Sequence, residues 1–445
     1  MSLLVPLIYF LIFLYVIQKA NFFKIEEISI RQLWIFFSIK IFAGLTLWYI
    51  YSNHYTLRNT SDAFRYFDDA MIVRNNLIEK PLDFFKILLG YDNGSEYFKA
   101  EYYEKMSTWN KPYYHRTYND NMTIIRLNMV FSLFSGGNYH VHTVLANVLS
   151  FIGLTAFLKG LKVFFKGKVA ALACLVFLTP SLLFWGSGVL KESIMIFSFG
   201  MFFMSAFKLI NRITIRYSFW LMVGFVGLAL SKFYVLLALL PFLISYAIVR
   251  KFNFKIAYAY ISVLTISSML AFGFKYVHPK YDLPDIMMDK QKDFINTGIE
   301  WKANSLVEIS RLDGTAWSMI KTIPEAIRNT LFRPYFPEAT NAMMITCSVE
   351  IFLIIIFCFL CYYYKSSLKH ININLFLLLL FYSLSMATLI GWVTPILGAV
   401  VRYKIALLPT LLATFLLIVN TERLRASFLG KHLLSKIEFL WNKTK

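Results

Sequence analysis

Apolar residues gather into eleven runs along the chain, and most of these runs approach the length that a helix needs to cross a bilayer, about 20 residues. Few charges interrupt the runs, and polar stretches separate them. The pattern predicts an all-α polytopic membrane protein, with about eleven transmembrane helices in a single integral membrane domain, 1–445. The expected spans are about 2–18, 32–51, 140–158, 169–187, 192–210, 217–231, 233–249, 256–274, 346–364, 373–391 and 396–419.

The connectors between these runs alternate between basic and charge-poor. Lys and Arg concentrate in 19–31, 159–168, 208–216, 250–255, 365–370 and the tail 420–445. Because basic connectors stay on the cytoplasmic side, the alternation places the N-terminus outside and the basic tail in the cytoplasm, as expected for a multi-pass protein of the cytoplasmic (inner) membrane. The 217–249 pair also fits one long kinked segment, which leaves the topology elsewhere unchanged.

Two long polar stretches, 52–139 and 275–345, are then outer loops. Both are rich in aromatic and apolar residues, which predicts structured loops. The stretch PLDFFKILLG (81–90) suits a juxtamembrane helix that lies in the membrane interface.

Composition separates a membrane protein from a nucleic-acid binder. The 445 residues are 58% hydrophobic and 16% charged, with a net charge of +20. Each outer loop is neutral, with 10 basic and 10 acidic residues in 52–139 and 9 of each in 275–345. The positive excess therefore lies elsewhere, mostly in the short connectors, and reflects topology; we expect no nucleic-acid partner. The sequence has no Gly-rich phosphate loop, no GxSxG elbow and no zinc-ligand spacing.

Three carboxylates lie just beyond the second apolar run, in NTSDAFRYFDDA (59–70). If this segment is helical, Asp62, Tyr66 and Asp69 share one face, whereas Asp68 points elsewhere. An Asp held at the boundary between water and lipid is a candidate general base or metal ligand. The structural alternative is that Asp62 caps a helix N-terminus and that Asp69 pairs with a nearby arginine.

Four cations from four different segments stand at the expected outer side of the membrane. They are Lys191, Lys232, Arg333 and Arg402. Snorkelling of a long side chain explains any one of them, but four together indicate an anion, such as the phosphate or diphosphate of a lipid carrier. The remaining candidate substrate-binding residues on this side are Glu192, Tyr66 and His115. We expect Asp62 to meet Arg402 and Arg333 across a lipid-accessible cleft.

The layout resembles the GT-C superfamily of polytopic glycosyltransferases, which use polyprenyl-phosphate-linked sugars. In that superfamily a long outer loop with a catalytic Asp follows the first core span, and a second outer loop follows the seventh. SDAFRYFDDA (61–70) takes the first place here, if 2–18 is an extra span. VRYKIALLP (401–409) looks like the Arg-Tyr-x-x-x-x-x-Pro segment of late spans. LFRPYFPEA (331–339) and PSLLFWGSGVLKE (180–192) look like segments of bacterial envelope-polysaccharide membrane proteins.

The resemblance covers the whole chain as topology and only short motifs as sequence. It implies a hexosyltransferase that moves a sugar from a polyprenyl-phosphate carrier to a saccharide, lipid or protein acceptor. The aromatic side chains of the first loop would then cover the bound sugars. Asp62 matches the catalytic Asp best, with Asp69 or Asp68 as alternates. The residues that match donor-phosphate contacts are Arg402, Arg333 and Lys191. The extra first span and the lack of a soluble C-terminal domain depart from many members. No cofactor is indicated, spaced acidic metal ligands are not evident, and the need for a divalent metal stays open.

Three rival functions fit parts of the same pattern. A polysaccharide polymerase or ligase, of the O-antigen or exopolysaccharide type, also has many spans, two large outer loops and outer arginines. One basic residue precedes a glycine by eleven positions, Arg126 and Gly137, a spacing that chance also produces. A flippase for lipid-linked saccharides would need polar residues along the full membrane thickness and often has inverted repeats with broken helices. A scaffolding protein of a secretion system is the third rival.

Overall fold

The computed structural model describes residues 3–54, 58–91, 94–110, 118–428 and 430–434. Within these residues the regular structure is helical, with only isolated β-bridges beside the helices. The all-α class predicted from the sequence is thereby confirmed.

Seven helices of the described chain are long and apolar enough to cross a membrane. They are α2 (Ile30–His54), α7 (Tyr139–Leu161), α10 (Lys191–Asn211), α12 (Phe233–Phe252), α13 (Ile256–Gly273), α16 (Ala342–Tyr363) and α17 (Ile373–Val393). The run 397–406, which contains α18 (Leu397–Tyr403), makes an eighth span if it is joined to α19 (Leu408–Ile418), from which a bend of 58° separates it. The chain is therefore a multi-pass membrane protein.

Three of the eleven predicted spans correspond to shorter apolar helices. They are α1 (Leu4–Lys19), α8 (Val169–Leu178) and α11 (Ile215–Ser231), with 16, 10 and 17 residues. The predicted span 169–187 is divided because Pro180 starts a separate short helix, α9 (Pro180–Trp185). Proline lacks an N–H group and drives the preceding residue out of the helical region. The number of eleven crossings stays a prediction.

Helices α7 and α10 form the centre of the bundle. Both are mostly buried, whereas α13 and α16 expose most of their apolar surface, as helices in contact with lipid do. The two central helices touch backbone to backbone at Gly153 and Gly200, where a Cβ atom on Gly200 would lie 1.8 Å from the Gly153 carbonyl oxygen. Small residues at a crossing let membrane helices approach closely and gain van der Waals contact. This packing fixes the position of the α10 N-terminus, where Lys191 and Glu192 lie.

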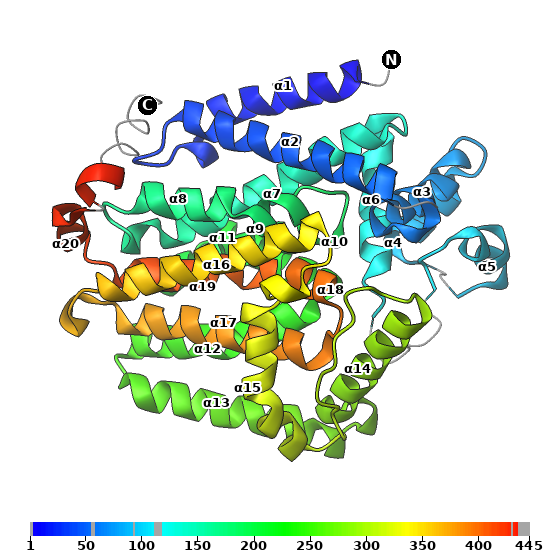
Figure 1. Cartoon of the computed structure of the whole chain (residues 1–445). Coiled ribbons are helices and arrows are strands. Elements are labelled where there is room, and N and C mark those ends of the chain that lie inside the picture. Colours follow the sequence, from blue (N-terminus) through cyan, green and yellow to red (C-terminus); the bar gives the residue numbers. More distant parts are fainter. Residues whose placement is uncertain (1–2, 55–57, 92–93, 111–117, 429, 435–445) are drawn as a thin grey trace.

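Most helices of the two long polar stretches lie at one end of the bundle (Figure 1). The first stretch forms α3 (Asp62–Asn75), α4 (Pro81–Leu89), α5 (Glu96–Glu101) and α6 (Asn121–Ser135), and the second forms α14 (Leu283–Glu300) and α15 (Ala316–Phe332). Helix α1 begins at this end as well, and α20 (Thr421–Ala426) lies at the opposite end. The N-terminal helix thus starts on the same side as both long loops.

Four aromatic residues of the first loop belong to the hydrophobic core of the protein. Phe98, Tyr102, Tyr103 and Trp109 are each at most 3% exposed, and the rings of Tyr103 and Trp109 stack with centroids 4.6 Å apart. Helix α3 packs on α6 in the same loop. These four rings therefore stabilise the loop and are not displayed on its surface for sugars.

The second loop is tied to the start of α18. Val307 N–H donates to the Pro395 carbonyl at 3.0 Å, and Leu397 N–H donates to the Ser305 carbonyl at 2.9 Å. From α14, the Gln291 amide donates to the Trp392 carbonyl at 2.7 Å. These bonds fix the direction in which α18 enters the bundle, and α18 carries Arg402 in its last turn.

Candidate active site

Arg402 is the centre of a buried group of charges that joins three distant segments. Its guanidinium holds Glu192 with two parallel hydrogen bonds of 2.9 Å, from Nε to Oε1 and from Nη2 to Oε2. Its third nitrogen, Nη1, donates to Oδ2 of Asp62, also at 2.9 Å. Glu192 lies in the first turn of α10, and Asp62 is the first residue of α3. The bidentate contact fixes the plane of the guanidinium, as expected for forked Arg–carboxylate geometry.

Lys191 extends this group toward the first loop. Its ammonium donates to Oδ2 of Asp120 and to Oδ1 of Asn121, each at 2.9 Å. The hydroxyl of Tyr66, one turn after Asp62 on α3, donates to the same Asn121 oxygen at 3.3 Å. Lys191 also lies over the Tyr66 ring, 5.6 Å from its centroid. Helices α3, α6 and α10 therefore meet at one set of polar side chains.

Lys232 completes the group from the turn between α11 and α12. Its Nζ is 3.9 Å from Asp120 Oδ2, beyond hydrogen-bond distance, and 4.6 Å from the centroid of the Tyr403 ring. We call the six charged residues the Arg402 network. They are Asp62, Asp120, Lys191, Glu192, Lys232 and Arg402.

The Arg402 network is closed on one side and open on the other. The side chains of Glu192 and Lys232 are 1% and 6% exposed, whereas that of Asp62 is 37% exposed. Three carboxylates balance three cations. Charges removed from water cost free energy unless they are paired, so this balance explains how the network is stable at membrane level.

Several N–H donors of the network make no hydrogen bond within the described residues. Arg402 has five N–H groups and uses three. The Lys232 ammonium makes no hydrogen bond to any described residue; the negative charges of Glu192 and Asp120 and nearby aromatic faces stabilise it. Spare donors around a half-exposed carboxylate are the arrangement that an added anion would satisfy.

Asp62 is ionised at neutral pH. Burial alone would raise the pKa of its carboxyl, but the positive charges of Arg402 and Lys191 and the hydrogen bond from Arg402 outweigh burial and hold the pKa below its ordinary value of 3.8. Burial and the negative charge of Asp62 raise the pKa of the Tyr66 phenol above its ordinary value of 10, so this hydroxyl stays protonated. Asp62 can therefore accept a proton, and Tyr66 can donate only a hydrogen bond.

Two buried side chains hold the segment that leads into Lys191 and Glu192. Lys40 of α2, only 1% exposed, donates to the Gly186 carbonyl at 2.7 Å and to the Ser187 hydroxyl at 3.2 Å. Asn147 of α7 donates to the Ser187 carbonyl at 2.8 Å. Irregular backbone at membrane depth must find its hydrogen bonds inside the protein, and these two side chains supply them.

The other two aspartates of the segment 59–70 have different roles. Asp69 is 2% exposed and accepts four hydrogen bonds, from the N–H and hydroxyl groups of Ser107 and Thr108. The Thr108 carbonyl in turn accepts from the Asn121 amide at 3.0 Å, so Asp69 positions Asn121 indirectly. Asp68 forms a bidentate pair with Arg58 in which both side chains are more than 40% exposed. Of the three aspartates, the structure brings only Asp62 to Arg402.

Arg333 does not join the network, contrary to the expectation that four cations would meet. Its guanidinium pairs with Glu338, five residues along the chain, and Nε donates to Oε1 at 2.9 Å. Its carbonyl accepts from the buried Lys404 ammonium at 3.1 Å. The local sequence RPYFPE turns the chain so that Glu338 reaches back, and this near partner satisfies Arg333. His115 lies outside the described residues.

Sequence reasoning missed three polar residues of this region. Asp120 and Asn121 lie where NDN (119–121) enters α6, a position that reads as an ordinary helix cap. Lys404, two residues after Arg402, is 3% exposed. The sequence signal for Lys404 was a lysine two residues after Arg402 in an apolar segment, and the signal for Asp120 was only its place before an apolar run.

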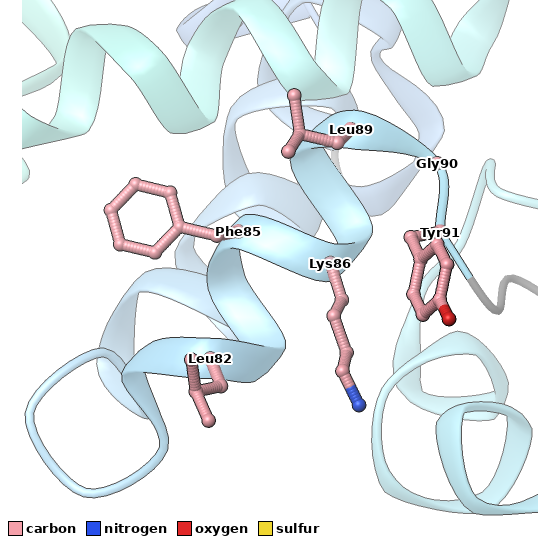
Figure 2. A pocket seen from close by; sticks show the side chains of 6 residues that line it. All are labelled: Leu82, Phe85, Lys86, Leu89, Gly90 and Tyr91. Atoms are coloured by element: carbon pink, nitrogen blue, oxygen red, sulfur yellow. The ribbon is translucent and has the colours of Figure 1, made fainter.

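A shallow hollow of about 380 Å³ lies on α4 and contains none of the network residues. Figure 2 shows Leu82, Phe85 and Leu89 projecting from this helix, with Lys86 and Tyr91 beside them. Leu82 is 73% and Leu89 81% exposed. The opposite face, with Phe84 and Ile87, is buried. An exposed apolar face with a lysine at its edge is typical of a helix in the membrane interface.

The described residues contain no group of three or more His, Cys, Asp and Glu side chains placed to hold a metal ion. Comparison with known proteins gives no match: no family model, no curated protein and no solved structure matches the chain significantly.

Proposed function

We propose that this protein is a membrane glycosyltransferase of the GT-C type, which moves a sugar from a polyprenyl-phosphate carrier to an acceptor hydroxyl at the outer face of the cytoplasmic membrane. The observation that carries the proposal is the Arg402 network, in which a half-exposed carboxylate stands beside cations with spare N–H donors. Its position at the end of the bundle that bears both long loops fits a site at a membrane surface.

In this proposal the donor is a phosphodiester with one negative charge, and its phosphate binds to Arg402, Lys191 and Lys232. The acceptor oxygen attacks the anomeric carbon, and its proton passes to Asp62. The bond between the anomeric carbon and the phosphate oxygen breaks, and its electron pair stays on the phosphate. The leaving phosphate thus gains a negative charge, which the three cations stabilise in a site partly closed to water. Direct displacement of this kind inverts the anomeric configuration.

Asp62 and Asp68 offer a matched pair for the test because both lie on α3 and both pair with an arginine. The assay measures sugar transfer by purified protein in lipid vesicles, with a panel of labelled polyprenyl-phosphate sugars and membrane-extracted acceptors. Asp62→Asn should lower the rate by a factor of at least about 10², while Asp68→Asn should stay near the wild-type rate. Full activity of Asp62→Asn in folded protein would remove Asp62 from the chemistry.

The same assay separates a transferase from a polymerase or ligase by the length of the product, since a transferase adds one sugar and a polymerase makes a ladder. A flippase is favoured by one observation, the bend of 58° between 397–406 and α19, because broken helices often line transport sites. Movement of a fluorescent polyprenyl-phosphate sugar across vesicles, without transfer to any acceptor, would support the flippase instead.

A further inference from the structure

Arg402 is shared between two carboxylates in unequal surroundings. Glu192 is 1% exposed and takes two guanidinium bonds, whereas Asp62 is 37% exposed and takes one. If Glu192 lost its bonds to Arg402, its buried carboxylate would be left as an uncompensated charge. Asp62, in contrast, can turn toward water at little cost in free energy. The Arg402–Asp62 bond is therefore the bond of the network that can open.

The oxygen that Asp62 places on Arg402 Nη1 occupies an anion position that the Lys191 ammonium also attracts, and the Lys232 ammonium lies beyond it, 3.9 Å from Asp120. Lys191 uses two of its three N–H donors, and Lys232 uses none among the described residues. Asp62 Oδ1 accepts no hydrogen bond in that part of the chain, so the carboxylate satisfies this position only partly. A phosphate offers more acceptor oxygens than one carboxylate and would satisfy more of these donors.

We propose that Asp62 is a displaceable stand-in for the phosphate of the donor lipid. In the free protein it neutralises Arg402; when a polyprenyl phosphate group binds, the Arg402–Asp62 bond is exchanged for an Arg402–phosphate bond. This proposal rests on the proposed function and adds the order in which donor binding and acceptor activation occur. Once released from its cation, Asp62 becomes a stronger base, so the acceptor hydroxyl is activated only when the donor is present.

The test is a binding measurement without sugar or acceptor. Polyprenyl monophosphate is titrated into purified protein in nanodiscs, and binding is followed by intrinsic tryptophan fluorescence, because the Arg402 guanidinium lies 5.8 Å from the Trp185 ring. The variants are Asp62→Asn, Arg402→Gln and the double variant, with Asp68→Asn as the surface control. Polyprenol without phosphate and inorganic phosphate are titrated separately. Thermal unfolding verifies that each variant is folded.

Removing the competing carboxylate should tighten binding of polyprenyl monophosphate by about fivefold in Asp62→Asn. The double variant should bind no more tightly than Arg402→Gln does. Asp68→Asn should bind polyprenyl monophosphate as the wild type does, and polyprenol should bind no more tightly to Asp62→Asn than to the wild type. Weaker or unchanged binding by folded Asp62→Asn overturns the proposal. A gain in affinity that persists in the double variant would reflect net charge alone and also overturns the proposal. An equally large gain in affinity for inorganic phosphate would exclude recognition of the lipid and overturns it as well. Tighter binding by Asp62→Asn, together with no sugar transfer by the wild-type protein from any donor of the panel, would refute the glycosyltransferase and leave the displacement intact.

Discussion

The strength of the Glu192–Arg402 pair can be predicted from its geometry. Two N–H···O bonds of 2.9 Å join charged groups that are 1% and 12% exposed. Hydrogen bonds to charged groups contribute about 1.5–3 kcal/mol each, and removing one partner of a buried pair costs about 3–5 kcal/mol. Because Arg402 keeps its hydrogen bond to Asp62 when Glu192 is replaced, we take the lower end of the second range. Glu192→Gln should cost about 3 kcal/mol in the free energy of unfolding.

A double-mutant cycle measures the pair itself. Glu192→Gln, Arg402→Met and the double variant are unfolded reversibly with SDS in mixed micelles, and the transition is followed by circular dichroism. The coupling energy should be about 2–3 kcal/mol, because the double variant buries no stranded charge. An ordinary hydrogen bond between membrane helices contributes only about 0.6 kcal/mol in such cycles. A coupling at or below that value would show that the network does not join α10 to α18, and the account of the site would be wrong.

Two further predictions concern the scaffold around the network. Gly200→Ala places a Cβ atom against the Gly153 carbonyl and should cost about 3 kcal/mol in the free energy of unfolding by overpacking. The control Gly273→Ala has no heavy atom within 4 Å of the new Cβ and should change that free energy by less than about 1 kcal/mol. Equal SDS unfolding midpoints for the two variants would contradict the close crossing of α7 and α10. Asp69→Ala leaves four donors without their acceptor and should speed hydrogen–deuterium exchange at the Thr108 amide, and unchanged exchange there would refute the capping role.

The sequence predicts the membrane helices well because their signal is local. A run of apolar residues must satisfy its own backbone in lipid, so length and composition are enough to indicate α2, α7 or α17. The division between α8 and α9 is also local, since it follows from Pro180, although the apolar run alone hides it.

Pairings between distant residues are harder to predict. An aspartate and an arginine that the predicted topology places on the same side suggest each other by charge, and the structure joins Asp62 to Arg402 across 340 positions. The same logic fails for Arg333, because Glu338 lies nearer in the chain and satisfies it first. Asp69 fails differently: the helical face that it shares with Asp62 is right, but the loop folds back and supplies Ser107 and Thr108 as donors.

The most direct test of the central claim is a structure determined by electron cryo-microscopy with polyprenyl monophosphate bound in nanodiscs. The account predicts a phosphate within hydrogen-bond distance of Arg402 Nη1 and of the Lys191 or Lys232 ammonium, with Glu192 still held by Arg402 and with Asp62 turned away from it. A phosphate bound elsewhere, with the Asp62–Arg402 bond intact, would contradict it.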